Sequence, residues 1–586
     1  MTSRASATRS AVADSRHVVL DTAFGSGAQF IAALARHRAG ERHLHYLAIA
    51  PAMPPASALA AGAPGLAAQW PVDVPGLHRL HLPSERVTLD LLIGPVESWL
   101  PEIIARVDEF IIPAPMDHIR ALQRLATPAS TLRIHQPDEQ AMRALRAAGF
   151  SVEGDAEDGW QHATYTSRKP QPPREPAPER RAIVIGAGVA GSAACERLAA
   201  RGWQVTLIER HESPAQEASG NRAGIFMPLL SKDDNIPTRL TRAAYLYAQR
   251  AWQNLGGIGP HAAGPDADAT LSRPAIRGDQ CGVLQLARDA EHALLQKEVV
   301  DTWRYPEQYV RWLDAGQAGA MLGVPTPYGA WHFPQGGWAT PATVCRAMLQ
   351  ACGDRLQRIF HAEALRIERA PGNGISAGVG WRVLAADGRE LASAPIVILA
   401  NGAGATALEQ ARELPLYTMR GQVTHLQDGT FPSLPMVVCR EAYMTPSVAG
   451  VISVGATYDR SDDRQLWQSS QDENLQRAEE ILGGAHGAGA PLQGRVGFRT
   501  MAPDRLPLVG PLPDSASEGR AERLRELPRH QGLYGLLGYA SRGLIWAPLA
   551  AEILACQLEG EPLPIEATLA AALDPGRFLL KQRRKL

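Results

Sequence analysis

The chain has 586 residues, of which 45% are hydrophobic and 20% are charged, and its formal net charge at pH 7 is −1. This length suits about two to four domains with proper cores. A chain so close to neutral has no global positive field, so any site for a polyanion must be a local patch. The six cysteines include no C-x-x-C pair, and we therefore expect reduced thiols, no metal site and a cytoplasmic protein. No apolar run approaches membrane-spanning length, so we expect no membrane partner.

The N-terminal part of the chain ends at a proline-rich break. We expect residues 1–16 to be a disordered start and residues 17–166 to form one domain. Strands that alternate with helices in this domain are typical of a doubly wound parallel sheet. The expected strands are His17–Leu20, His43–Ile49, Val87–Ile93, Asp108–Ile112, Thr131–His135 and Ala163–Thr166. Residues 167–181 contain five prolines and mixed charges, which indicates a linker.

A glycine turn directly after the linker carries the clearest chemical signal. A short buried strand at Ala182–Ile185 leads into Gly186, Gly188 and Gly191, which open a helix with its N–H groups facing outward. A second strand follows at Trp203–Ile208, and Glu209 stands 23 positions after Gly186. An acid at this place can accept both ribose hydroxyls of an adenosine, while the pyrophosphate sits at the helix N-terminus. The pattern predicts a site for FAD or NAD rather than NADP.

Beyond this turn the pattern indicates a second sheet. We expect helices at Pro237–Leu255, Ala287–Val300 and Leu544–Leu558, and a buried strand from Ala394 that ends in a glycine turn and rejoins the nucleotide-binding sheet. Further strands are expected at Cys281–Leu286, Phe360–Ile367, Trp381–Ala385, Met419–Leu426, Val437–Thr445, Gly450–Ala456 and Gly532–Gly538. The strands between 419 and 456 look antiparallel, so a second sheet should cap the first.

Residues 182–586 resemble the FAD-dependent oxidoreductase half of the bifunctional tRNA 5-methylaminomethyl-2-thiouridine biosynthesis family, which is related to glycine and D-amino acid oxidases. The resemblance rests on GAGVAG with Glu209, ASGNRAGIFMPLLS at 218–231, CGVLQL at 281–286, FPQGGW at 333–338, LANG at 399–402, MRGQVTH at 419–425, GFRTMAPDRLPLVG at 497–510 and GYASRGL at 538–544. It implies an α/β fold in which an FAD-binding Rossmann domain carries an inserted antiparallel-sheet substrate domain.

The N-terminal domain resembles the Rossmann-like methyltransferase half of the same family in a degenerate form. The run from Asp21 through Gly25 to Gly27 is similar to the family's S-adenosylmethionine loop, which normally begins with Glu and has Gly where Ala23 stands. The family's ribose-binding acid is missing before Pro51, and its acid near the adenine is replaced by Pro95. The family's Asp-Gly-Phe-Ala-Pro run corresponds only to Ile112-Pro-Ala-Pro115. S-adenosylmethionine binding and methyl transfer are therefore doubtful.

The resemblance implies a tRNA substrate with a modified wobble uridine and a defined reaction. The carboxymethyl group of 5-carboxymethylaminomethyl-(2-thio)uridine would be oxidised at its methylene carbon, and hydrolysis of the imine would release glyoxylate and leave 5-aminomethyl-(2-thio)uridine. It also implies that the residues around FAD are Gly186, Gly188, Gly191, Glu209, Ser219, Asn221, Arg222, Gly336, Gly337, Ser541, Arg542 and Gly543.

An arginine is the natural partner for the substrate carboxylate because its guanidinium binds a carboxylate through two parallel hydrogen bonds. The candidates are Arg420, Arg499 and Arg505, with Tyr443 as a neutral partner. We expect His332 and His425 to be packed histidines rather than bases. Two other interpretations stay open, namely an oxidase of free glycine or another secondary amine, and a tRNA-binding scaffold with a vestigial flavin site.

Overall fold

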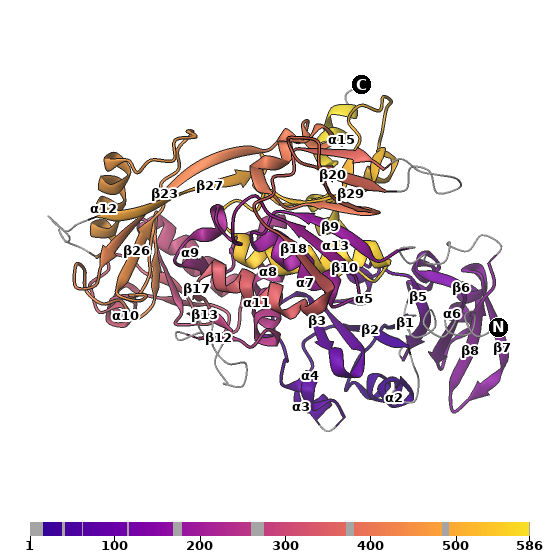
Figure 1. The fold of residues 1–586 in the computed structure, drawn as a ribbon. Helices are drawn as coiled ribbons and strands as arrows, with labels where there is room; N and C mark the ends of the chain where they lie inside the picture. Colours follow the sequence, from indigo (N-terminus) through magenta and orange to yellow (C-terminus); the bar gives the residue numbers. More distant parts are fainter. Residues whose placement is uncertain are drawn as a thin grey trace. The chain divides into compact units, whose positions relative to one another are not determined.

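The computed structural model describes residues 16–37, 42–60, 62–113, 117–167, 179–259, 275–370, 380–482 and 492–584. Its contacts divide the chain into two compact units (Figure 1). Unit 1 comprises Met1–Pro178 and Cys556–Ala570, and unit 2 comprises Glu179–Ala555 and Ala571–Leu586. The expected disordered start and linker fall almost wholly outside the described residues. The segment 556–570, which the sequence assigns to the oxidoreductase domain, is grouped with unit 1.

Unit 1 contains an eight-stranded sheet in the order β3-β4-β2-β1-β5-β6-β8-β7. Its central strands are parallel, whereas β3, β8 and β7 run antiparallel to their neighbours. The parallel sheet expected from the sequence is therefore extended at both edges by antiparallel strands. The strands are β1 (Arg16–Asp21), β2 (His43–Ala50), β3 (Gly76–Leu82), β4 (Val87–Ile93), β5 (Val107–Ile112), β6 (Ala126–His135), β7 (Phe150–Glu157) and β8 (Trp160–Tyr165).

Both faces of this sheet carry a hydrophobic core. Successive residues of β1 point to opposite faces, so Val18 and Leu20 join one core and Val19 joins the other. The helices of unit 1 are α2 (Ala28–His37), α3 (Ser57–Ala60), α4 (Pro64–Ala67), α5 (Val96–Trp99) and α6 (Glu139–Ala147). A central sheet with two buried faces confirms the Rossmann-like class of this domain.

Unit 2 contains a six-stranded sheet in the order β18-β10-β9-β22-β29-β28. All neighbours are parallel except the antiparallel pair β28 and β29. Its strands are β9 (Arg181–Ile185), β10 (Gln204–Ile208), β18 (Leu356–Ile359), β22 (Ile396–Leu399), β28 (Leu508–Pro513) and β29 (Arg529–Leu537). Helix α7 (Val189–Ala199) connects β9 to β10, and α13 (Gly543–Glu559) follows β29. This is the expected nucleotide-binding sheet, and β22 rejoins it beside β9.

A second large sheet of unit 2 has eight strands in the order β15-β16-β14-β24-β25-β26-β23-β27. Apart from the parallel pair β14 and β24 its neighbours are antiparallel, as expected. Helix α12 (Gln468–Leu482) lies over β23 and β26 in Figure 1. The strands are β14 (Val283–Leu286), β15 (Arg311–Leu313), β16 (Ala330–Phe333), β23 (Tyr417–Gln427), β24 (Val437–Cys439), β25 (Tyr443–Met444), β26 (Val451–Gly455) and β27 (Gln493–Met501).

Smaller elements complete unit 2. A four-stranded sheet contains β11 (Gly224–Phe226), β12 (Ile258–Gly259), β13 (Ile276–Asp279) and β17 (Gly337–Ala339), and a three-stranded sheet contains β19 (Arg366–Arg369), β20 (Trp381–Leu384) and β21 (Glu390–Ala394). The remaining helices are α8 (Ile236–Asn254), α9 (Ala290–Trp303), α10 (Ala315–Leu322), α11 (Pro341–Ala351), α14 (Ala567–Leu573, within unit 1 up to Ala570) and α15 (Arg577–Arg583).

Two expected strands are each split in the structure. The strand expected at Phe360–Ile367 is replaced by β18 and β19, which belong to different sheets, because the chain turns at His361 with a φ of 53°. The strand expected at Val437–Thr445 is a tight hairpin of β24 and β25, closed by a hydrogen bond from Arg440 N to Ala442 O of 2.8 Å. In both cases a short turn interrupts a run whose composition alone suits a strand.

Candidate functional site

The turn between β9 and α7 is held by close backbone contacts. Gly186 has a φ of 104°, and a Cβ there would lie 2.6 Å from the carbonyl oxygen of Ala400. Gly191 lies in the first turn of α7, where a Cβ would lie 1.8 Å from the carbonyl oxygen of Gly186. Only glycine permits this approach. Helix α7 therefore starts soon after the end of β9, and the positive end of its dipole can favour an anion there.

Glu209 braces this turn from the end of β10. Its side chain is 8% exposed. One carboxylate oxygen accepts a hydrogen bond from Ala187 N at 2.7 Å, and the other accepts one from His211 N at 3.0 Å. The acid thus stands beside the glycine turn, as a carboxylate that receives ribose hydroxyls must.

The loop before β11 covers the start of α7. Ser219 Oγ accepts a hydrogen bond from Val189 N at 3.2 Å. Arg495 fixes this loop by donating to Asn221 Oδ1 at 3.1 Å and to Gln216 O at 2.8 Å. A Cβ on Gly220 would lie 2.3 Å from the Arg495 guanidinium, so this glycine leaves room for the arginine. Arg495 on β27 is a structural residue that the sequence did not single out.

These elements surround a cavity of about 730 Å³ in unit 2. This volume lies in the usual range for cofactor and ligand sites. Seven of the residues predicted to bind FAD line it, namely Gly186, Gly188, Glu209, Ser219, Asn221, Ser541 and Gly543. The start of α13 is a second helix N-terminus at the cavity, and its positive end favours negative charge there. The structure therefore brings two distant glycine turns to one cavity.

The other predicted FAD residues lie outside the cavity lining. Gly191 packs against the carbonyl oxygen of Gly186 and so supports the turn. A Cβ on Gly337 would lie 1.9 Å from Asp279 O, and one on Gly336 would lie 2.8 Å from a methyl group of Val283, so these glycines allow close packing of strands. Arg222 is exposed. The Arg542 side chain is half-buried and donates to Met227 O at 3.4 Å instead of lining the cavity.

The turn after β22 is a further part of the cavity wall. Asn401, Gly402, Ala403 and Gly404 line it, and Asn401 Oδ1 is buried without a hydrogen-bond partner among the described residues. An unpartnered buried acceptor in a cavity suits a ligand that donates a hydrogen bond. The sequence signal for these residues is their place directly after a buried strand of the nucleotide-binding sheet, since ligands bind at the carboxyl ends of such strands.

Among the candidates for the substrate carboxylate, Arg499 on β27 lines the cavity. Its Nη1 donates to Thr457 O at 3.0 Å, and its guanidinium lies 4.1 Å from the centre of the Tyr458 ring. A Cβ on Gly421 would lie 2.3 Å from Arg499 Nη1, so this glycine leaves space for the side chain. Within the described chain, Nε and Nη2 of Arg499 make no hydrogen bond, and both can therefore bind an incoming carboxylate.

Polar groups gather near Arg499. Burial raises the pKa of Tyr443 to about 12, although the nearby charge of Arg499 opposes this shift. Tyr443 is thus a neutral hydrogen-bond donor close to that arginine. Burial also lowers the pKa of Arg542, which is influenced by Cys439 and Tyr458. The predicted contact of Arg542 with FAD stays a prediction.

The other two arginine candidates have different surroundings. Arg420 is 0% exposed and lines neither this cavity nor the smaller one described below. It donates to Asp463 O at 2.9 Å and to Gln422 Oε1 at 3.0 Å, and it stacks on Trp467 at 3.8 Å. Arg505 is exposed and also outside both cavities. Arg420 is therefore a packed structural residue, and the geometry favours Arg499.

The two histidines considered as bases have depressed pKa values. Burial lowers the pKa of His332 to about 4, with a further contribution from Arg311. Burial also lowers the pKa of His425 to about 4, with contributions from Arg222 and Arg495. Both are neutral near pH 7 and neither lines the cavity, which agrees with packed histidines.

In unit 1, one side of the turn after β1 packs against hydrophobic side chains. Gly25 and Gly27 have φ values of 55° and 77°. A Cβ on Gly27 would lie 2.8 Å from a methyl group of Leu59 and 3.1 Å from the ring of Phe24. Phe24 and Leu59 are buried, so Gly27 packs against the hydrophobic core, whereas Gly25 is exposed. Ala114 and Pro115 of the altered Asp-Gly-Phe-Ala-Pro run lie outside the described residues.

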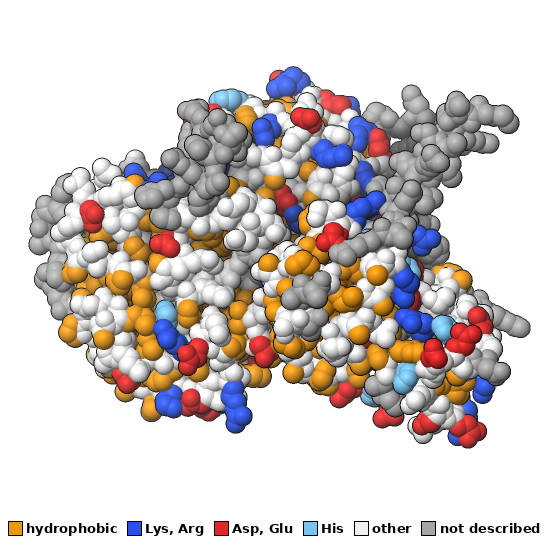
Figure 2. Space-filling model, turned by 90° about the horizontal axis from the view of Figure 1, so that it is seen from below, with side chains coloured by type: hydrophobic (Ala, Val, Ile, Leu, Met, Phe, Trp, Pro, Cys, Tyr) orange, Lys and Arg blue, Asp and Glu red, His pale blue; other side chains and the backbone are white. Residues whose placement is uncertain are grey.

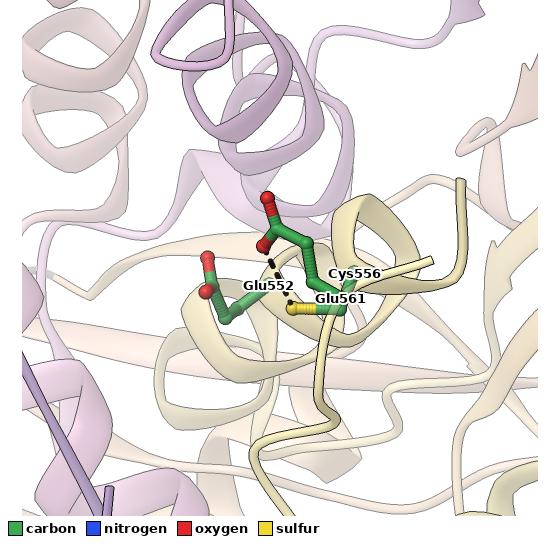
Figure 3. A group of neighbouring side chains, drawn as sticks. All are labelled: Glu552, Cys556 and Glu561. Atoms are coloured by element: carbon green, nitrogen blue, oxygen red, sulfur yellow. Dashed lines mark hydrogen bonds between the residues drawn. The ribbon is translucent and has the colours of Figure 1, made fainter. Parts of the chain in front are cut away.

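Figure 3 shows one group of metal-ligating residue types, formed by Glu552, Cys556 and Glu561. Cys556 Sγ donates to Glu561 Oε2 at 3.5 Å. Within unit 2, Glu552 receives Arg201 Nη2 at 2.8 Å and Arg197 Nη1 at 3.7 Å. These ion pairs already neutralise the Glu552 carboxylate. The absence of a metal site stays a prediction.

None of the six cysteines is in a disulfide. In the described part of the chain, every helix is too short or too polar to cross a bilayer.

Residues 181–557 match the model of the family described as FAD dependent oxidoreductase. The chain is 40% identical over 612 residues to the tRNA 5-methylaminomethyl-2-thiouridine biosynthesis bifunctional protein MnmC of Burkholderia thailandensis, which covers 97% of this chain and 90% of that protein. The protein of the same name from Azoarcus sp. is 40% identical over 602 residues, covering 97% and 91% of the two chains.

Among solved structures, glycine oxidase from Geobacillus kaustophilus superposes with a TM-score of 0.54 at 21% identity, covering 68% of this chain and 99% of that one. Iminodiacetate oxidase from Chelativorans sp. superposes with a TM-score of 0.51 at 24% identity, covering 65% and 96%. These similarities concern the fold alone. The matched residues and the extent of identity show that the chain belongs to the FAD dependent oxidoreductases and, over nearly its whole length, to the family of bifunctional tRNA 5-methylaminomethyl-2-thiouridine biosynthesis proteins.

Proposed function

We propose that this chain modifies the wobble uridine of tRNA. The reaction removes the carboxymethyl group of 5-carboxymethylaminomethyl-(2-thio)uridine by FAD-dependent oxidation and leaves 5-aminomethyl-(2-thio)uridine. The observation that carries the proposal is the single cavity that joins the glycine turn and Glu209 to the guanidinium of Arg499. The part of the cavity at the glycine turn suits a dinucleotide, and the part at Arg499 suits a carboxylate. Membership of a family named for tRNA thiouridine biosynthesis supports the choice of substrate.

Different residues of the cavity suit different parts of the cofactor and the substrate. Glu209, the start of α7 and Ser219 would hold the adenosine and pyrophosphate, and the start of α13 at Gly543 would favour negative charge on a bound flavin. FAD supplies the acceptor for hydride transfer from the substrate methylene. Water then cleaves the resulting imine to glyoxylate and the aminomethyl nucleoside. The remaining task of the chain is to position the N–CH2–COO⁻ group.

Arg499 is the residue that we assign to the substrate carboxylate. Its two unpaired guanidinium nitrogens can form two charge-assisted hydrogen bonds to one carboxylate. The contacts with Thr457 O and the Tyr458 ring hold the side chain in place before substrate arrives. Tyr443, which is neutral at pH 7, is a second donor near this position.

Analysis of tRNA nucleosides tests this function. A strain that lacks the gene should accumulate the carboxymethylaminomethyl nucleoside, and adding the purified yellow protein to that tRNA should convert the nucleoside and release glyoxylate. An unchanged nucleoside profile in the strain would contradict the proposal. Turnover of free glycine without any change in tRNA would instead favour the small-molecule oxidase, and a protein without flavin would favour the scaffold.

The residues of unit 1 do not fit S-adenosylmethionine. Asp21 is 0% exposed, and its carboxylate accepts hydrogen bonds from Tyr46 OH at 2.7 Å and Ala23 N at 3.0 Å. Burial raises the pKa of Asp21 to about 6. Strand β2 is followed by Pro51, whereas the corresponding strand of unit 2 is followed by Glu209. The strand ends are also tied together, since Gly94 N donates to Ala50 O at 2.8 Å.

We propose that unit 1 keeps the methyltransferase fold without the cofactor. A nucleoside cofactor needs a carboxylate for its ribose hydroxyls, and the residue that follows β2 is Pro51 instead of an acid. The product of this chain is then the aminomethyl nucleoside. Its amine can be methylated only by a separate methyl-transfer reaction.

Calorimetric titration of the purified flavoprotein with S-adenosylmethionine should show no saturable binding. In parallel, tRNA incubated with the protein and S-adenosylmethionine should gain the aminomethyl nucleoside without its methylated form. The yellow colour serves as the control for folding of the chain. Saturable heat with one site per chain, or appearance of the methylaminomethyl nucleoside, would contradict this expectation.

We further propose the remaining assignments. Residues 17–166 form the methyltransferase-like domain and residues 182–586 the oxidoreductase, with 556–570 contributing to the compact unit of the former. The cytoplasm suits a protein that acts on tRNA and has six cysteines outside disulfides.

A further inference from the structure

A second cavity opens beside the proposed active site. It has a volume of about 640 Å³ and is lined by Ala403, Thr406, Leu416, Tyr417, Thr418, Arg460, Ser461, Asp462 and Thr500. Ala403, Thr418, Asp462 and Thr500 also line the cavity of about 730 Å³. The two cavities are therefore adjacent and share one wall. The N–CH2–COO⁻ group that Arg499 receives does not need this second space.

One wall of the second cavity is a loop at residues 457–467, between β26 and α12, which we call the mouth loop. Buried Arg420 shapes it through backbone hydrogen bonds in both directions with Asp459, of 2.9 and 3.0 Å, and through its donation to Asp463 O. Trp467 stacks on the same guanidinium, and its Nε1 donates to Asp463 Oδ2 at 2.6 Å. An irregular segment held by this many bonds presents its outward side chains in a fixed arrangement.

The mouth loop and its neighbour Tyr417 expose aromatic and apolar surface. Tyr458 is 53% exposed, Leu466 is 48% exposed and Tyr417 is 36% exposed. Arg460 and Arg464 are exposed on the same loop. Exposed aromatic rings beside arginines, next to a cavity, are unusual on a surface that faces only water.

The charge of the mouth loop favours a single-stranded RNA that stacks on side chains over a partner held by electrostatic attraction alone. Arg460 and Arg464 are outnumbered in the mouth loop by Asp459, Asp462 and Asp463, so the loop itself has a net charge of −1. Figure 2 shows one face of the molecule, on which positive and negative side chains are interspersed. Proteins read unpaired RNA by stacking bases on aromatic rings and arginine planes, which requires little net charge.

We propose that Tyr417, Tyr458 and Arg460 form a platform for the nucleotides that flank the modified uridine. This inference rests on the proposed function, because it assumes that the substrate group arrives on an RNA strand. Tyr417 stacks a neighbouring base in the second cavity, Arg460 contacts a phosphate, and Tyr458 joins the platform to Arg499. The platform thereby distinguishes an anticodon loop from a free amino acid.

Binding of a fluorescein-labelled anticodon stem–loop to the flavoprotein, followed by anisotropy, tests the platform. Tyr417→Leu should raise Kd about 5- to 150-fold, whereas Tyr417→Phe should keep affinity because the ring face is retained. Arg460→Ala should weaken binding and reduce the salt dependence by about one phosphate contact. Leu294→Ala and Arg389→Ala alter exposed side chains that line neither cavity and should leave Kd unchanged.

A second readout separates this inference from the proposed function. The ratio of kcat/KM for tRNA to that for the free modified nucleoside should fall about 5- to 150-fold in Tyr417→Leu. If the wild-type protein oxidises neither substrate, the proposed function fails, while the anisotropy series still judges the platform. The platform is refuted if Tyr417→Leu and Arg460→Ala bind the stem–loop as tightly as Leu294→Ala.

Discussion

The Arg499→Ala protein is expected to lose about 10²- to 10⁴-fold in kcat/KM while it keeps its flavin. Two charge-assisted hydrogen bonds to the substrate carboxylate contribute about 1.5–3 kcal/mol each, and about 1.4 kcal/mol corresponds to a factor of ten in rate. Both bonds are lost on truncation. The flavin should remain because the contacts of Arg499 are with Thr457 O and the Tyr458 ring, and not with the glycine turn or Glu209. Stopped-flow measurement of flavin bleaching by modified tRNA reports the effect directly.

Two variants sharpen this test. Arg499→Lys keeps the charge but not the planar pair of donors, so its kcat/KM should fall between those of the wild type and the alanine variant. Arg505→Ala is the matched control, since Arg505 is exposed and lies outside both cavities. Wild-type bleaching by a flavin-containing Arg499→Ala protein would contradict the assignment. Equal losses at both arginines would indicate a general effect of charge.

The nucleotide-binding half of the site could be predicted from sequence because its signals are local. A strand, a glycine turn, a helix and a terminal acid follow one another within about 30 residues, and their spacing fixes their geometry. The structure places Gly186, Gly188 and Glu209 around one cavity accordingly. The second glycine turn at Gly543 joins them from far along the chain, and its place follows from the return of β29 to the same sheet.

The substrate half could not be predicted to the residue because it depends on strand register. Arg420 and Arg499 lie on the paired strands β23 and β27, where Arg420 stands opposite Phe498 and Arg499 opposite Met419. This one-residue offset turns the two arginines to opposite faces, one toward buried packing and one toward the cavity. The sequence offered both as equal candidates, and only Gly421, which leaves space for Arg499, hints at the difference.

The sequence also could not predict that residues 556–570 group with unit 1. Within unit 1, the guanidinium of Arg79 donates to Asp90 Oδ2 at 2.7 Å and to Pro562 O at 2.7 Å, and Leu563 N donates to Ile104 O at 3.0 Å. Neither the burial of this arginine nor its distant partner has a local sequence pattern. A chain that looks like two successive domains therefore completes its first unit with a segment near its end.

The Gly191→Ala protein is expected to purify without colour. The added methyl group would stand 1.8 Å from Gly186 O, which is part of the turn itself and cannot rotate away as a flexible side chain can. The start of α7 must shift, and a displacement of about 1 Å at a binding constellation can cost about 100-fold in function. Overpacking also costs about 1–3 kcal/mol in stability. Visible absorbance per mole of protein, with and without added FAD, measures the loss.

Gly316→Ala is the matched control for this glycine substitution. Gly316 lies on α10, where the nearest atom to an added Cβ is 3.4 Å away. Alanine should be tolerated there and should stabilise the helix slightly, because it restricts the unfolded chain more than glycine does. A yellow Gly191→Ala protein with wild-type FAD content would show that the turn tolerates the shift. The close contact between helix and turn would then not be what positions the cofactor.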